Sequence, residues 1–246
     1  MPGLRLALCA LLAAMPVVSI AAADEFPPEF RTLGLGQTAA ELDTEGYEYF
    51  ACGSNGGPPK QQIGGWTDFM ECRPEASGLR EVYVEFGRRI GQLSQMFRER
   101  YEDELWIQKY GGTRMANYPV VLSLLFDEEG VVRGFRAITD DRAPNEDRGR
   151  AYLFRFSVFG KYGGGASDWN CIARDPAPGQ SPVGTMYLNE VCTRTIDGRD
   201  IRVEAHFFRK PGQTGMDSFG MFEEGQYESL TRWEVYDSSL GLGGAG

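Results

Sequence analysis

Two stretches of similar design decide the expected fold: CRPEASGLREVYVEF at residues 72–86 and CTRTIDGRDIRVEAHF at residues 192–207. In each, a glycine lies six residues after the cysteine and opens a run in which apolar and polar residues alternate. Alternation with a period of two places the apolar side chains on one face of a β-strand and the polar ones on the other. Both stretches therefore predict strands of an antiparallel sheet with one buried face and one solvent-exposed face.

Further strands are expected elsewhere in the chain. Residues 120–126 and 131–138 are rich in β-branched and aromatic residues, and the segment 127–130 between them ends in glycine, so they predict a hairpin. Gly134 lies where the alternation of the second strand slips, which indicates a bulge. Alternation over 231–235 predicts the last strand.

Helices are expected to be few. Residues 38–41 form a capping box that predicts a short helix ending before Gly46. Residues 145–147 combine a capping asparagine with two acids, typical of a second helix start. The following residues 152–159 fit either a strand or a helix, and the duplication described below favours the helix. Residues 92–105 predict a third helix.

Four of the five cysteines follow the apolar N-terminal segment: Cys52, Cys72, Cys171 and Cys192. An even number in an exported chain predicts two disulfides, and of three connectivities we favour Cys52–Cys72 and Cys171–Cys192 because both pairs are local. Each would contribute roughly 3 kcal/mol by constraining the unfolded chain. A zinc site is the alternative, but the chain has no C-x-x-C spacing, and we expect no metal.

The cysteine spacings and the shared strand pattern predict an internal duplication. Each unit would run from a helix through two cysteine-bearing strands to a third strand and a further hairpin, which places Cys72 on a strand. The expected fold class is α+β: antiparallel sheets covered on one face by a few short helices, in two tandem related units, each held by one disulfide. The first unit covers residues 34–142 and the second 143–237, with a flexible segment at 24–33 and a flexible tail at 238–246. In outline this resembles the helix-plus-sheet modules of exported inhibitor and outer-membrane assembly proteins, a similarity that implies no activity.

The first 23 residues predict a signal peptide. Arg5 precedes an apolar run at residues 6–18, and Ala21–Ala23 offers the small residues that signal peptidase needs. The apolar run is shorter than the ~20 residues that span a bilayer, and no later stretch is long enough. We therefore expect a periplasmic or secreted protein without a transmembrane segment after leader cleavage.

The charge of the chain bears on its partners. The formal net charge is −10, and loss of Arg5 with the leader makes it −11. An acidic surface repels phosphate backbones, so we expect no nucleic-acid partner.

No catalytic or cofactor motif stands out. His206 is the only histidine, so every serine or cysteine mechanism with a histidine base depends on it, and its place on the polar side of a predicted strand favours a solvated surface residue. Ser54 and Ser167 each lack one glycine of a nucleophile elbow. Residues 34–39 superficially match a dinucleotide fingerprint, but no strand precedes them. We expect no catalytic residues and no cofactor.

Acidic residues leave two further hypotheses. The segment 140–147 carries several oxygen ligands suited to calcium, although its arginines partly cancel the charge and helix capping explains the same residues. A carboxylate pair for glycoside hydrolysis is defined by a separation in space that a sequence does not reveal, and Glu223 and Glu224 follow an aromatic run that could line a cleft.

Aromatic residues beside the cysteines suggest a binding surface. Most are expected to lie in the core, but the glycine- and proline-rich loops 53–65 and 173–184 are each anchored by a disulfide, and anchored loops often present binding surfaces. The candidate residues are Tyr49, Trp66, Trp169 and Tyr187.

These observations favour an exported, disulfide-containing, non-enzymatic binding or accessory protein of the bacterial periplasm, whose partner is another exported or envelope protein. A periplasmic carrier of a small molecule or lipid is one alternative. A carboxylate-dependent hydrolase is the other.

Overall fold

The computed structural model describes residues 34–44, 47–86, 113–163, 166–213 and 227–242. The predicted signal peptide, the segment 24–33, the predicted helix 92–105 and the pair Glu223 and Glu224 lie outside the described residues. Two helical stretches form the segment between the two halves of the chain: α4 (Asn145–Arg150) and α5 (Phe154–Lys161), joined by η2 (Ala151–Leu153). The strands are β1 (Tyr47–Cys52), β2 (Arg80–Phe86), β3 (Arg114–Met115), β4 (Tyr118–Phe126), β5 (Val132–Thr139), β6 (Asn170–Ala173), β7 (Leu188–Ile196), β8 (Arg199–Phe208) and β9 (Glu228–Asp237).

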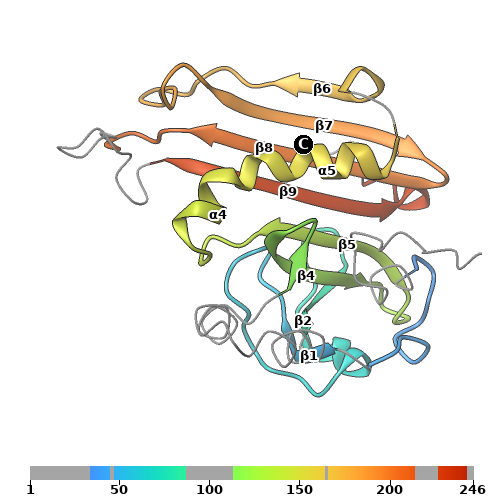
Figure 1. Ribbon diagram of the computed structural model, residues 1–246. Coiled ribbons are helices and arrows are strands. Elements are labelled where there is room, and N and C mark those ends of the chain that lie inside the picture. Colours follow the sequence, from blue (N-terminus) through green and yellow to red (C-terminus); the bar gives the residue numbers. More distant parts are fainter. Residues whose placement is uncertain (1–33, 45–46, 87–112, 164–165, 214–226, 243–246) are drawn as a thin grey trace, which may run out of the picture.

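The nine strands within the described residues belong to one antiparallel sheet. Its order is β1-β2-β4-β5-β9-β8-β7-β6, and the short β3 pairs with β4 off this path (Figure 1). The predicted hairpin is confirmed as β4 and β5, and its register skips Arg133 beside Gly134, which confirms the bulge. The strands predicted from alternation are confirmed as β2, β8 and β9.

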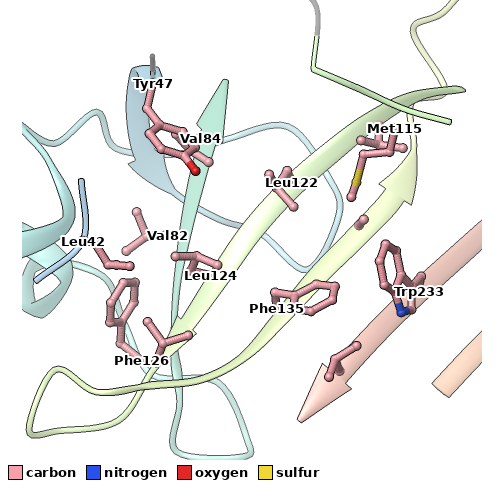
Figure 2. Close-up of a cluster of buried hydrophobic side chains, with 14 of the residues drawn as sticks. Leu42, Tyr47, Val82, Val84, Met115, Leu122, Leu124, Phe126, Phe135 and Trp233 are labelled. Carbon is pink, nitrogen blue, oxygen red and sulfur yellow. The ribbon is translucent and has the colours of Figure 1, made fainter. Parts of the chain in front are cut away.

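One face of the sheet carries the hydrophobic core. In the first half, η1 (Trp66–Glu71) and the segment 34–44 cover it, and in the second half α5 lies over β8 and β9 (Figure 1). Figure 2 shows the apolar side chains of β2, β4, β5 and β9 turned to this side. Its centre is the Trp233 ring, which packs edge-on against Phe135 at a centroid distance of 4.8 Å and lies 6.1 Å from Phe154.

The helix predictions are partly confirmed. Residues 152–159 are helical, as the duplication favoured. The short helix predicted to start at the capping box 38–41 does not form in the described residues 34–44, because this segment is a turn whose backbone pairs with the β4–β5 hairpin through Ala39 N–H to the Gly130 carbonyl at 2.8 Å. Glu41 does reach back to the Thr38 N–H at 2.8 Å, so the capping contact forms without a helix. Asn145 is the first residue of α4 rather than its cap.

Both predicted disulfides are confirmed, but their settings differ. Cys171 and Cys192 are directly opposite each other on β6 and β7, whereas Cys52 ends β1 and Cys72 follows η1. The prediction that Cys72 lies on a strand is therefore wrong, because the aromatic residues of η1 bury themselves against β4 before the chain enters β2. The tandem relation of the two halves is not confirmed, and their strands share one sheet.

The second face of the sheet, called the outer face here, was predicted to be solvent-exposed. This is wrong at the centre of the sheet, where Glu81, Arg136 and Glu234 are buried. Residues 53–58, the turn 74–80 and the segment after β9 lie over this face, with Leu240 and Leu242 packed beside Leu79, Leu125 and Tyr236. The first residues of the predicted tail thus contact the sheet. Among the residues described, no helix has both the length and the apolar composition to cross a membrane.

Candidate functional site

A pocket lined mostly by polar residues opens on the outer face, between the three segments that cover this face. It has a volume of ≈ 760 Å³ and is called the outer-face pocket below. Its floor comes from β5, β9 and β8, and its walls come from the loop after β1, the turn before β2 and the segment after β9. The lining residues are Asn55, Glu75, Ala76, Ser77, Arg136, Arg202, Glu204, Arg232, Glu234, Tyr236 and Leu242.

Strand register builds the floor. Arg136 on β5 is directly opposite Glu234 on β9, and Glu234 is directly opposite Arg202 on β8. Two positions further along, Glu204 on β8 faces Arg232 on β9. Opposite charges on facing positions of neighbouring strands attract each other, so the central strands carry a checkerboard of charge.

Arg136 is the centre of this network. Its Nε donates to Glu234 Oε1 at 2.7 Å, and its Nη1 lies 2.8 Å from Glu75 Oε1 and 3.0 Å from Glu81 Oε2. Three carboxylates therefore surround one guanidinium group that is almost wholly buried. Because five N–H donors in a planar fork can serve several carboxylates at once, arginine fits this position and lysine does not.

The rest of the floor extends the network toward β8. Arg202 Nη2 donates to Glu204 Oε2 at 2.8 Å, and Arg202 Nη1 donates to Glu234 Oε2 at 3.3 Å. His206 Nε2 lies 3.0 Å from Glu204 Oε1. The only histidine is therefore half-buried in an ion-pair network and is not the solvated side chain predicted from the sequence.

Asn55 holds one wall of the pocket onto the floor. Its backbone N–H donates to Glu81 Oε2 at 2.6 Å, and its carbonyl accepts from Arg232 Nη1 at 3.2 Å. Asn55 and Gly56 both have positive φ values, 61° and 91°, and a Cβ atom at Gly56 would lie 2.1 Å from Ile138 Cδ1. The glycine lets the loop press against the outer face, since any side chain there would collide with β5.

The opposite wall is a tight turn. The Glu75 N–H donates to the Leu79 carbonyl at 2.8 Å, and the Gly78 N–H donates to the Glu75 carbonyl at 2.9 Å. The Cys52–Cys72 disulfide joins the two walls at their roots, because Cys52 leads into the Asn55 loop and Cys72 leads into the Glu75 turn. The disulfide thus sets the separation of both walls.

The carboxylates that line the pocket are held ionised. Hydrogen bonding to His206 and the charge of Arg202 outweigh burial and lower the pKa of Glu204 to about 2. Burial alone would raise the pKa of Glu234, but Arg232 and Arg136 outweigh it and lower that pKa to about 2. Burial, together with the charge of Glu234, raises the pKa of the Tyr236 hydroxyl to about 12.

The pKa values of Glu75 and Glu81 shift in opposite directions. Burial raises the pKa of Glu81 against the opposing charge of Arg136. For Glu75 burial acts in the same direction, but hydrogen bonds and the charge of Arg136 outweigh it and its pKa is lowered. Glu81 lies beneath Arg136 and does not line the pocket, whereas Glu75 does.

This arrangement suits binding better than proton transfer. A general acid needs a raised pKa within reach of a substrate, and the lining carboxylates have lowered pKa values. The lining residues of opposite sign balance, with Arg136, Arg202 and Arg232 against Glu75, Glu204 and Glu234. Such a surface offers donors and acceptors side by side, with no net formal charge among its arginines and glutamates.

The four aromatic residues proposed as a binding surface lie apart. Trp66 and Trp169 are only 1% and 5% exposed, so their rings pack in the core, whereas Tyr49 is 43% exposed and half-buried Tyr187 stacks on Phe208. Tyr49 belongs to β1 and Tyr187 precedes β7, which places them about 29 Å apart at ~4.8 Å per strand spacing. A binding role for these four residues stays a prediction.

Two aspartates of the acidic segment 140–147 form ion pairs with arginines. Asp140 pairs with Arg142 at 2.7 Å, and Asp147 pairs with Arg114 at 3.4 Å. Within the described ranges, no three histidine, cysteine, aspartate or glutamate side chains gather as metal ligands. The calcium hypothesis gains no support from this geometry.

Sequence reasoning missed the outer-face pocket. Its signal was present in the polar members of the alternating strands, Arg202 and Glu204 on β8 and Arg232 and Glu234 on β9. Nothing in the sequence gave the register that sets these pairs opposite each other. Comparisons with protein-family models, with curated proteins and with solved structures found no match for this chain.

Proposed function

We propose that this chain is an exported, non-enzymatic binding or accessory protein of the bacterial periplasm, and that the outer-face pocket is where it contacts another exported or envelope protein. The two disulfides are compatible with a protein outside the cytoplasm. The observation that carries the proposal is an open hollow of ≈ 760 Å³ lined by equal numbers of arginines and glutamates.

The chemistry of the pocket favours a protein segment as its occupant. An anion would meet Glu204 and Glu234, which stay ionised far below neutral pH, and a lipid tail would have to displace water from charged groups. A polypeptide that carries both acidic and basic side chains can pair with both kinds of floor residue. Electrostatic complementarity of this kind gives specificity more than raw affinity.

Strand order supports a related part of the proposal, the descent of the two halves from one unit. The four strands β1, β2, β4 and β5 run from one edge to the middle, and β6, β7, β8 and β9 run from the other edge to the middle. Each half thus begins with a cysteine-bearing edge strand and ends at the β5–β9 pair, as a duplicated unit would.

The test is capture of a partner by the mature protein, with intact disulfides, from periplasmic extract of its source organism. We expect one protein to bind stoichiometrically. The variant Ala76→Arg places a long charged side chain at the pocket rim and should abolish capture. Ala40→Arg makes the same change at an exposed turn outside the pocket and should leave capture intact.

The outcomes separate the parts of the proposal. A protein that captures no partner under these conditions would refute the binding function. A partner that both variants retain would refute the pocket as its site while leaving the binding function in place. Circular dichroism of both variants shows whether each is folded before capture is compared.

A carboxylate-dependent hydrolase is the second candidate, and the specific observation in its favour is the opposite pKa behaviour of Glu75 and Glu81. Arg136 contacts both carboxylates, and Glu81 is buried beneath it, so a substrate would reach Glu75 alone. Hydrolysis of glycosides by the wild type that Glu75→Gln abolishes would favour this function over binding.

A further inference from the structure

The two edges of the sheet differ in whether a further segment of the chain forms hydrogen bonds along them. Outside β1, the chain folds back so that the Cys52 N–H donates to the Gln61 carbonyl at 2.8 Å and the Ile63 N–H donates to the Phe50 carbonyl at 3.0 Å. At the other edge lies β6, which pairs only with β7 among the described strands (Figure 1). All four residues of β6 are exposed. An open edge strand is a template for pairing with another chain.

The register shows which backbone groups of β6 point away from β7. The Arg174 N–H donates to Asn189, its direct partner on β7, at 2.7 Å. Hydrogen-bonded and non-hydrogen-bonded pairs alternate in an antiparallel ladder. Ile172 and Asn170 therefore also point their N–H and carbonyl groups toward β7, while Cys171 and Ala173 point theirs away from the sheet.

The side chain at the middle of this edge is apolar. Ile172 is 62% exposed, which is the largest value among the exposed large apolar side chains of the described residues. Protected edges usually carry a charge or a proline instead. The Cys171–Cys192 disulfide holds β6 against β7 from the core-bearing face of the sheet, opposite Ile172, so the edge keeps its geometry without a further strand.

We propose that β6 is a self-pairing edge, through which two copies of this chain join their sheets antiparallel about a two-fold axis at Ile172. In this register Cys171 of each copy is opposite Ala173 of the other, so the outward backbone groups meet as hydrogen-bonded pairs. The two Ile172 side chains become directly opposite neighbours and cover each other.

Charge complementarity favours a second copy over an unrelated peptide. The same register sets Asn170 opposite Arg174 of the other copy, and Asp168, which ends η3 (Ala166–Asp168) just before β6, lines the same surface hollow as Asn170. Diagonal neighbours in a sheet lie roughly 7–8 Å apart, a distance that an arginine side chain can bridge. The symmetry repeats this contact, so one apolar pair is flanked by two acid–base contacts. Within its own chain Arg174 also pairs with Glu204, a lining residue of the outer-face pocket, at 3.1 Å, but the inference does not rest on what that pocket binds.

The experiment is sedimentation analysis of the mature protein with intact disulfides, from micromolar to near-millimolar concentration. About 0.15 M salt limits the repulsion between two acidic copies, because the Debye length is then about 8 Å. Since a short strand buries little area, we expect a reversible monomer–dimer equilibrium and not a permanent dimer. A monomer throughout the range would overturn the proposal.

Three variants locate the contact. Ile172→Lys should raise the dimer dissociation constant by roughly tenfold or more, since it brings two charges face to face. Phe156→Lys removes another exposed apolar side chain, 53% exposed on α5, and should change nothing. Ala173→Pro removes an outward N–H that β7 does not use, so it should weaken the dimer roughly tenfold while the fold persists. Equal effects of Ile172→Lys and Phe156→Lys would contradict the proposal.

A photo-crosslinker tests the register. Replacing residue 172 by benzoylphenylalanine should yield a covalent dimer on irradiation, with the link in residues 170–174 of the other copy. The same replacement at residue 156 should yield none. A link elsewhere, or a monomer whose β6 instead captures an extended peptide from another protein, would refute self-pairing.

Discussion

Replacing Arg136 by methionine tests whether the buried charge network holds the outer face together. Methionine fills a similar length but donates no hydrogen bond, so Glu75, Glu81 and Glu234 lose the guanidinium that all three share. Removing one partner of a buried ion pair costs about 3–5 kcal/mol, because the remaining charge stays buried without compensation. Arg136 and Glu234 are 4% and 5% exposed in their side chains, so this buried regime applies.

The size of the loss can be worked out from the carboxylates. Lowering the pKa of Glu234 from its usual 4.5 to about 2 corresponds to about 3 kcal/mol of stabilisation at neutral pH, to which Arg232 and Arg136 both contribute. Glu81 offsets part of the loss, because its pKa is already raised and it can take up a proton. We therefore expect Arg136→Met to cost about 3 kcal/mol, near the lower end of the range for buried pairs.

Urea and thermal unfolding at pH 7, followed by circular dichroism with both disulfides intact, measure this loss. For a chain of this size about 3 kcal/mol lowers Tm by roughly 6–12 °C. Arg133→Met is the matched control, since Arg133 lies on the same strand and pairs with two aspartates but is 32% exposed. Such a surface pair is worth about 0–1 kcal/mol. If both variants lose the same stability, or Arg136→Met loses less than about 1 kcal/mol, the reasoning is refuted.

Three further predictions follow from the same geometry. Glu234 has a lowered pKa, so the stability that it contributes is present above pH 4.5 and is lost as the pH falls toward 2. Glu81 has a raised pKa, so the stability that it contributes is fully present below pH 4.5 and is lost as the pH rises through the raised pKa. Unfolding measured from pH 2 to 8 should therefore show a weaker acid dependence in Glu234→Gln, while Glu204, whose pKa is also lowered to about 2, keeps its own contribution. Glu81→Gln should gain stability relative to wild type as the pH rises. Curves parallel to that of the wild type would contradict this. Replacing either cysteine pair by serine should cost roughly 3 kcal/mol in denaturant unfolding, because the paired cysteines are 20 and 21 residues apart. Only loss of Cys52–Cys72 should weaken partner capture. Equal capture by both double variants would contradict the role of this disulfide in the pocket walls. Gly198→Ala should lower the free energy of unfolding by about 1 kcal/mol or more, because Gly198 has φ 69° in the β7–β8 turn. Gly160→Ala in α5 is the control, since a Cβ atom there would have no atom within 4 Å, and thermal unfolding should show it to be neutral or stabilising.

Local pattern was enough to predict most strands and both disulfides. The alternation over residues 80–86 and 201–207 determines two faces whatever the strands pair with, because successive side chains of a strand always point to opposite sides. The hairpin of β4 and β5 likewise depends on neighbours in sequence, and Gly134 already indicated its bulge. The cysteine pairs were predictable because each closes a short loop.

The sequence failed where distant segments meet. Residues 38–41 carry a capping box, yet the backbone of this segment pairs with the β4–β5 hairpin, and these tertiary hydrogen bonds outweigh a weak local preference. Cys72 was expected on a strand, but the apolar residues before it gain more by burial in η1. The polar face was expected to be solvent-exposed because alternation shows only which residues share a face. It does not show which other segments of the chain cover that face.

The sequence by itself therefore determined which charged side chains lie on the polar face of each strand. The tertiary structure decided which of them contact one another. Arg136 and Glu234 are 98 residues apart in the chain, and Arg136 and Glu75 are 61 apart. Only the order and register of β5, β9 and β8 bring them opposite one another, and only the loops joined by Cys52–Cys72 cover them. Register and cover both follow from packing the whole sheet against its core, a long-range free energy that no short window of sequence contains.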